Sequence, residues 1–414
     1  MFQSVLIVVL MLFQTTPISP DTTDLSALSV EKALEIAYRQ NPQIKQLQYQ
    51  IRAQEKQEVL SFGISDPEIK YMREGIDGGG FTEQRWAVSQ SMEFPLSSIY
   101  RNRQELSTTR SLELKLQDLK NQVKADVKTA YTQLAYALQS GNVAGERVQL
   151  FENLSEAAQA RADMGESSEI DAMQADLQLQ EARNNQETAF KEIMNTRYDL
   201  FQTIGLDPEE QTYDIGFTDT LSYLIVDIDQ EVVMEKLEGH PRLQQIQKEV
   251  EASIYGKKLA KSTYLPDMNL SYYRQDFGND YDFYGFEVGV SIPLWFVTRQ
   301  APKVQQANAI LNANEWKYED QRLLIKKQAE QTWHSYESAK NNIERFRENI
   351  QSKSLELVQM TQKGYSLGEL DLLTLLEAQR TYLRTQETYY QTLRDYYLTV
   401  IDLERYLQTN IIFN

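Results

Sequence analysis

The sequence lacks cysteine altogether and contains only two histidines, His240 and His334. The absence of cysteine excludes disulfide bonds, thiolate metal sites, a cysteine nucleophile and a lipidated N-terminal cysteine. The two histidines are not at metal-binding spacing, and the sequence shows no phosphate-binding loop and no serine–histidine–aspartate set. We therefore predict that the protein is not an enzyme and holds no cofactor and no metal.

Positive charge is also scarce. The chain has 42 lysine and arginine residues against 60 aspartate and glutamate residues, for a formal net charge of −18. This balance excludes nucleic acid as a partner, because binding a phosphate backbone needs a basic surface. The hydrophobic share of 41% is too small for a bundle of membrane helices, although 24 tyrosines and 15 phenylalanines are many for so polar a chain.

Long apolar runs are missing except for Val5–Phe13 near the N-terminus. A membrane-spanning helix needs about 20 apolar residues, so this run predicts the apolar region of a secretory signal. Residues 1–24 are interpreted as a signal peptide and linker, and the protein is predicted to be exported. The alternative is a buried N-terminal strand, but no second apolar strand lies nearby in the sequence to pair with it.

The most informative feature that is present is an internal duplication. Asn41-Pro42 is echoed by His240-Pro241, Pro67 by Pro266, Phe94-Pro95-Leu96 by Ile292-Pro293-Leu294, Gly165 by Gly368 and Ala175 by Ala378, each 198 to 203 residues apart. A period this long means two copies of a substantial unit rather than a solenoid. We place the first repeat at 25–206, a linker at 207–229, the second repeat at 230–408 and a tail at 409–414.

Each repeat switches its pattern from helix to strand and back. The first has a helical region with a break at Pro42, strands near 68–76 and 84–94, and a helical hairpin over 97–204. The second has strands near 267–275 and 284–292 and a helical hairpin over 303–407. The outgoing helices contain no proline for about 60 residues, which corresponds to roughly 90 Å, far beyond a globular domain.

Four strands per chain cannot close a barrel, and their open edges require partners, most simply identical copies. An exported chain with aromatic strands therefore suggests a barrel shared between copies in the outer membrane. Two alternatives stay open: a periplasmic coiled-coil scaffold or adaptor without a pore, and an exported hydrolase that uses paired carboxylates.

These residues closely resemble the outer membrane efflux protein (TolC-like) family over about Leu28 to Leu407. The resemblance depends on Asn41-Pro42, on Phe94-Pro95-Leu96 and Ile292-Pro293-Leu294, and on two turn signatures. The signatures are Met164-Gly165-Glu166-Ser167, followed by Met173-Gln174-Ala175, and Leu367-Gly368-Glu369-Leu370, followed by Leu376-Glu377-Ala378.

The resemblance implies a homotrimer in the outer membrane of a Gram-negative-type bacterium. Its fold would be mainly α with a small β part: a shared 12-stranded transmembrane β-barrel and an α-helical barrel in the periplasm. The function implied is a passive, water-filled channel of a tripartite efflux system. Its partners would be outer-membrane lipid, a periplasmic adaptor (membrane fusion) protein and an inner-membrane pump, while drugs, metal cations and proteins all remain open as cargo.

The resemblance and the strand pattern together give candidate site residues. The predicted adaptor-binding tips are Arg161, Met164, Gly165, Glu166 and Ser167, with Lys363, Gly364, Leu367, Gly368, Glu369 and Leu370 in the second repeat. The predicted periplasmic gate is Asp171, Thr374 and Glu377. The predicted lipid face or girdle of the barrel is Trp86, Val88, Phe94, Tyr284, Phe286, Val288 and Val290. Alternatively, the glycines serve only as helix C-caps and the acidic gate residues lie on solvated helix faces.

Overall fold

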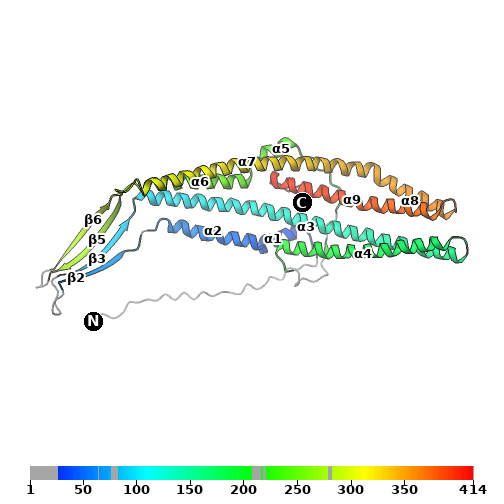
Figure 1. Ribbon diagram of the computed structural model, residues 1–414, viewed down its shortest axis with the longest axis horizontal. Coiled ribbons are helices and arrows are strands. Elements are labelled where there is room, and N and C mark those ends of the chain that lie inside the picture. The colour runs from blue at the N-terminus through cyan, green and yellow to red at the C-terminus, as the bar shows by residue number, and fades with distance from the viewer. Residues whose placement is uncertain are drawn as a thin grey trace.

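The computed structural model describes residues 27–63, 65–75, 83–207, 216–217, 221–277 and 282–413. The predicted signal segment lies outside this part of the chain, as do residues 77–80 and 278–280, which connect the predicted strands of each repeat. The described residues form an elongated bundle of helices with a small sheet at one end (Figure 1). This arrangement confirms the prediction of a mainly helical fold with a small β part.

The elements of the two halves follow one another in the same order. The first half has β1 (Ala27–Leu28), α1 (Val30–Gln40), α2 (Pro42–Leu60), β2 (Glu68–Glu74), β3 (Glu83–Met92), α3 (Pro95–Asp163) and α4 (Glu169–Ile204). The second has β4 (Gly216–Phe217), α5 (Gln230–Lys236), a 3₁₀ turn (Leu237–Gly239), α6 (Pro241–Ser262), β5 (Asp267–Asp276), β6 (Asp282–Ser291), α7 (Gln300–Arg345), a π-helical turn (Phe346–Ile350), α8 (Gln351–Ser366) and α9 (Leu372–Leu407). The sequence repeat therefore corresponds to a repeat of structure.

The predicted helix breaks occur at both Xaa-Pro pairs. Asn41 caps α2, because its side-chain oxygen accepts a hydrogen bond from the Gln43 amide at 2.9 Å. His240 caps α6 in the same way, with Nδ1 accepting from the Arg242 amide at 3.2 Å. In each case proline occupies the first helical turn, where the missing backbone N–H would have no hydrogen-bond partner within the helix.

The sheet joins the two halves. Its order is β2-β3-β5-β6, with every neighbouring pair antiparallel. Each half contributes one hairpin, and the hairpins are linked by pairing of β3 with β5, in which Val88 lies opposite Tyr272. β3 ends at Met92 rather than at the predicted position 94. Phe94 instead caps α3 in extended conformation, because the following Pro95 begins the helix; the prediction that Phe94 lies in the strand is wrong.

The long helices extend away from the sheet toward two turns at the far end (Figure 1). α3 runs without interruption for 69 residues, or about 100 Å. Its counterpart in the second half is interrupted by the π-helical turn, where the Phe346 ring lies 6.1 Å from that of Tyr389. The absence of proline predicted a continuous helix here, but a π-helical turn needs no helix-breaking residue.

The core is a narrow stripe along the bundle rather than a compact centre. On α9, this stripe consists of Leu376, Leu383, Leu393, Tyr397, Val400 and Leu407, which are buried, and of Tyr390, which is partly buried. One charged pair lies within this stripe. Lys128 Nζ, fully buried, donates to Glu404 Oε2 and to the Ile412 carbonyl, both at 2.7 Å, and so fixes the C-terminal tail against α3 and α9.

The segment that joins the repeats crosses α7 and α9 as an extended strap, defined here as Leu221–Asp229. Tyrosine hydroxyls hold its backbone: Tyr336 donates to the Val226 carbonyl at 2.6 Å and Tyr397 to the Ser222 carbonyl at 2.7 Å. Tyr396 lies between them and donates to the Leu224 carbonyl at 3.0 Å. The strap thus satisfies its backbone groups through side chains instead of secondary structure.

Among the described helices, none combines the length and the apolarity that crossing a membrane would need.

Candidate functional site: a two-faced sheet and two helical tips

The sheet has one apolar face and one polar face, because its register brings residues of like character opposite each other. The apolar face consists of Ile69, Tyr71, Trp86, Val88, Met268, Leu270, Tyr272, Tyr284, Phe286, Val288 and Val290. These side chains are largely uncovered; Phe286 is 81% exposed and Val290 56%. Such a contiguous apolar patch is not left in water by a soluble monomer.

The polar face carries alternating charged, hydroxyl and small residues. It consists of Glu68, Lys70, Arg85, Ala87, Ser89, Asn269, Ser271, Tyr273, Gly285, Glu287 and Gly289. Both of its cations are paired with a glutamate of the same face: Lys70 with Glu68 at 2.9 Å and Arg85 with Glu287 at 3.1 Å. Small residues leave a hollow of about 290 Å³ over this face.

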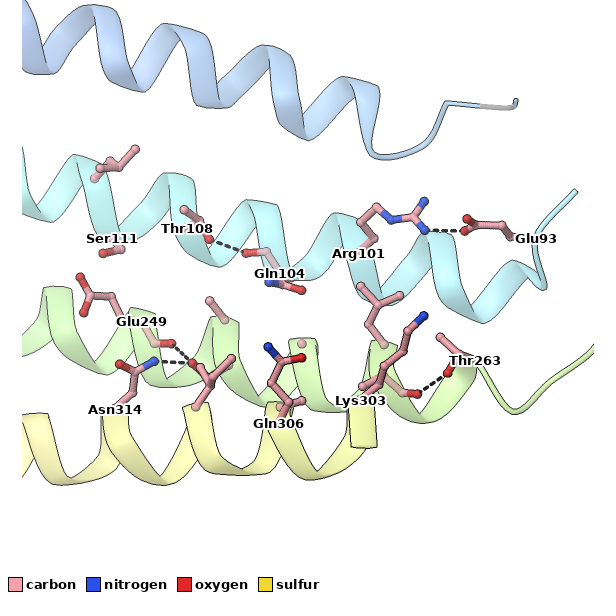
Figure 2. A pocket seen from close by; sticks show the side chains of 18 residues that line it. Glu93, Arg101, Gln104, Thr108, Ser111, Glu249, Thr263, Lys303, Gln306 and Asn314 are labelled. Atoms are coloured by element: carbon pink, nitrogen blue, oxygen red, sulfur yellow. Dashed lines mark hydrogen bonds and ion pairs between the residues drawn. The ribbon is translucent and has the colours of Figure 1, made fainter. Parts of the chain in front are cut away.

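Two further hollows continue from the polar face toward the helices. The first, about 410 Å³, is bordered by Asp267 and Ser291 at the ends of β5 and β6. The second, about 750 Å³, lies among α3, α6 and α7, and it shares Glu93, Arg101 and Lys303 with the first. Figure 2 shows polar side chains of all three helices, such as Gln104 and Asn314, directed into this groove. The hollows thus follow one another from the polar face of the sheet to a groove in the bundle, whose lining mixes polar residues with apolar ones such as Leu112, Leu259 and Ile310.

Both turns at the far end of the bundle have the same backbone geometry. Gly165 and Gly368 have φ of +72° and +75°. In each turn the glycine amide and the next amide bond back to the helix: Gly165 to Ala162 and Glu166 to Arg161, both at 2.9 Å, with the equivalent pair after Gly368. This is the Schellman arrangement, for which a left-handed glycine is preferred. The interpretation of both glycines as C-caps is therefore correct.

The two tips touch each other across the end of the bundle. The Arg161 guanidinium lies 5.2 Å from the centre of the Tyr365 ring, and Arg161 Nε lies 3.8 Å from Glu166. Gly364 packs against Leu370, where an added Cβ would lie 2.6 Å from a side-chain carbon. Between the tips is a cleft of about 670 Å³, bordered by Arg161, Glu166, Leu367 and Gly368.

The remaining predicted tip residues are on the surface. Met164 is 65% and Leu367 63% exposed, and Glu369 and Lys363 are also exposed. Ser167 is partly buried, and its hydroxyl has no hydrogen-bond partner within the described structure. The sequence-predicted set is thus brought together at one end of the molecule from two turns about 200 residues apart in the chain.

Several solved structures with this fold are outer-membrane channels. The outer-membrane channel OprN aligns with a TM-score of 0.78 at 16% identity, over 92% of this chain and 90% of that one. The CmeC outer membrane channel of Campylobacter jejuni aligns with 0.79 at 12% identity, over 91% and 85%. The open MtrE outer membrane channel of Neisseria gonorrhoeae aligns with 0.73 at 15% identity, over 91% and 88%. No curated protein matches the sequence.

The family model described as "Outer membrane efflux protein" matches residues 232–408. This range is the second repeat. The chain has the fold of the outer membrane efflux proteins, and its residues 232–408 belong to their family. The predicted resemblance is therefore confirmed, and with it an efflux component of the outer membrane rather than an enzyme.

The predicted gate residues lie at the starts of the two return helices. Asp171 completes a capping box with Ser168 at the start of α4, and Thr374 donates its amide to Asp371 at 2.9 Å at the start of α9. Glu377 pairs with Arg380 at 3.1 Å. Hydrogen bonding to Thr374 holds the Asp371 pKa below its ordinary value. Asp171 and Thr374 occupy equivalent third helical positions, so helix capping accounts for both.

Sequence reasoning assigned no functional role to the polar face of the sheet. The alternation that singled out the apolar residues also places Arg85, Tyr273 and Glu287 on the opposite side. That signal was available in the strand pattern, but the contacts among these three residues depend on the pairing of β3 with β5 and of β5 with β6.

Proposed function

We propose that the protein is a passive, water-filled channel that three copies build together in the outer membrane. The observation that carries this proposal is the unclosed sheet with one apolar and one polar face. Both edge strands, β2 and β6, pair on one side only within the described chain. Backbone groups at membrane depth must all be hydrogen-bonded, so these edges need further strands.

The strand order allows identical copies to supply them. Each pair of neighbouring strands in the order β2-β3-β5-β6 is antiparallel. Because the direction reverses three times from β2 to β6, these two edge strands also run in opposite directions. β6 of one copy can therefore pair antiparallel with β2 of the next, and n copies give 4n strands. Two copies would give eight strands, whose interior side chains fill. Three copies give twelve, an even number wide enough for water.

The two faces then have distinct roles. The apolar face, including Trp86, Val88, Tyr284, Phe286, Val288 and Val290, would meet outer-membrane lipid, with tyrosine and tryptophan at the interfaces. The polar face would line the lumen, defined here as the interior of the shared barrel. The series of hollows supports this side as the interior, since it leads from the polar face of the sheet onto α3, α6 and α7. The helices would continue the conduit into the periplasm.

We further propose that the helical tips bind a periplasmic adaptor, which links the channel to an inner-membrane pump. The cleft between the tips and the exposed Met164 and Leu367 support this assignment, because they offer apolar contacts beside the charged Arg161 and Glu166. Asp171, Thr374 and Glu377 lie one helical turn further in, and we propose that they line the narrow end of the conduit.

Reconstitution in planar lipid bilayers tests the channel. The purified protein is expected to produce stepwise conductance and to migrate in detergent as a complex about three times the 48.1 kDa of one chain. A monomer that stays dissolved without detergent and shows no conductance would instead indicate the scaffold without a pore.

Engineered disulfides test the closure of the barrel directly, since the natural sequence has no cysteine. Val288→Cys on β6 is combined in turn with Ile69→Cys, Tyr71→Cys and Arg73→Cys on β2. One of these pairs is expected to link separate chains on oxidation. The control combines Val288→Cys with Val88→Cys, because β3 is an inner strand; no link between chains in any β2 pair would contradict the proposed closure.

A further inference from the structure

Arg85 lies near the start of β3, and its side chain is held in a specific position on the polar face. Its guanidinium lies 3.8 Å from the centre of the Tyr273 ring and donates to Glu287 at 3.1 Å. Its Nε is buried and has no hydrogen-bond partner within the described structure. Arginine stacks on an aromatic ring and pairs with a carboxylate at the same time because its charged group is planar.

Tyr273 takes this position because of a glycine on the next strand. Gly285 lies directly opposite Tyr273 in the β5–β6 pairing. A Cβ at Gly285 would lie 2.4 Å from the tip of the Tyr273 ring. The missing side chain therefore lets the ring lie across β6, and the ring in turn supports the Arg85 guanidinium.

The charges of the polar face are unevenly distributed along the strands. Lys70 and Arg85 each pair with a glutamate of this face, Lys70 with Glu68 and Arg85 with Glu287, so these four charges balance. At the start of β3, two residues before Arg85, Glu83 lies opposite Glu74, so this end of the face is acidic. At the other end, acidic and basic groups are mixed, because Asp267 borders a hollow together with Glu93, Arg101, Arg299 and Lys303. Arg85 therefore lies between the acidic end and Glu287, which would lose its partner without it.

We infer that Arg85 determines the charge selectivity of the lumen, an inference that rests on the proposed channel. Its charge offsets that of Glu287, so that this pair does not add to the cation preference set by Glu74 and Glu83 at the acidic end of the face. Tyr273 and Gly285 are positioning residues that hold the guanidinium in place. The conduit should then admit anionic as well as cationic solutes.

The test measures the reversal potential of reconstituted channels in a KCl gradient, which gives the K⁺ to Cl⁻ permeability ratio. In Arg85→Gln we expect this ratio to rise about twofold or more, because each copy loses one positive charge from the lumen. In Glu287→Gln the ratio is expected to fall. Both changes in the permeability ratio should become smaller at higher salt concentration, since ions screen the fixed charges. A change caused only by altered structure would not decrease as the salt concentration rises.

Two variants serve as controls. Arg274→Gln removes a positive charge from β5 on the apolar face, where Arg274 pairs with Asp282 at 2.6 Å, and it should leave the ratio unchanged. Arg85→Lys keeps the charge and should keep the wild-type ratio. An unchanged ratio in Arg85→Gln, or an equal shift in either control, overturns the inference. If Arg85→Gln fails to assemble, the sign of the Glu287→Gln shift decides. Absence of conductance in the wild type refutes the channel itself.

Discussion

At the scale of single residues, the turn at each helical tip depends on one glycine. Gly165 and Gly368 both have positive φ, yet a side-chain carbon at either would meet nothing within 4 Å. The requirement for glycine is therefore conformational and not steric. The free energy lost on replacing either glycine therefore reports the backbone conformation alone, without a contribution from packing.

Substituting Gly165 or Gly368 with alanine should loosen the corresponding tip by about 1 kcal/mol, because a left-handed conformation is unfavourable for a residue with a Cβ. Hydrogen exchange of the amides at 160–170 or 363–373 measures the change. Gly239→Ala is the matched control, since Gly239 also has open space around its Cβ position but no positive φ. Equal protection in wild type and Gly165→Ala would show that the turn tolerates alanine.

At the scale of elements, the strap Leu221–Asp229 connects the two repeats through tyrosine side chains. Burial raises the pKa values of Tyr336, Tyr396 and Tyr397, since the phenolate form would lose solvation. Tyr223, on the strap itself, has a pKa raised to about 12 by burial and by its hydrogen bond to Glu344. The hydroxyls of Tyr336, Tyr396 and Tyr397 donate to backbone carbonyls of the strap, and that of Tyr223 donates to Glu344. A phenolate cannot donate in this way.

The strap should therefore be sensitive to alkali. The folded-state tyrosine pKa values lie above the unfolded value of about 10, so the stabilisation is fully present below pH 10. It is lost as pH rises through the folded-state values. Thermal unfolding measured from pH 8 to 12 should show a falling midpoint above about pH 10. Tyr336→Phe and Tyr396→Phe should lower the midpoint at pH 8 and weaken this alkaline dependence; an identical pH profile in both would contradict the role of the hydroxyls.

At the scale of the whole molecule, the sheet and the bundle differ in whether their apolar residues are covered. The bundle covers a narrow apolar stripe with polar helix faces, whereas the sheet leaves its apolar face open. An exposed residue on the apolar face of the sheet is thus expected to meet lipid, whereas most exposed residues of the bundle are polar and are expected to meet water.

Phe286→Lys should therefore impair insertion into the outer membrane, since a lysine facing lipid at the bilayer midplane costs about 2–4 kcal/mol. Ser271→Lys is the control on the neighbouring strand, where Ser271 faces the polar side, and this substitution should be tolerated. The measurement is the amount of each variant in the outer-membrane fraction, together with the amount of assembled complex in detergent. Normal insertion of Phe286→Lys would mean that this face does not contact lipid.

Much of this structure could be predicted from local patterns in the sequence. The proline pairs at Pro42 and Pro241 determined the helix breaks, and the alternation through Trp86 and Val88 determined which strand residues share a face. Such features depend on residues within a few positions of one another, where backbone sterics and side-chain periodicity act directly. The duplication was visible for the same reason, because each copy repeats these local signals.

Only the tertiary structure decided how distant segments meet. Arg85 contacts Tyr273 and Glu287 because β3 pairs with β5, about 190 residues later in the chain. No local pattern in the sequence specifies that pairing. The same holds for the tyrosines that bind the strap, for Lys128 against Glu404, and for the contact of Arg161 with Tyr365 across the two tips. Contacts of this kind follow from the packing of whole elements, which buries apolar stripes and satisfies backbone groups over the length of the molecule.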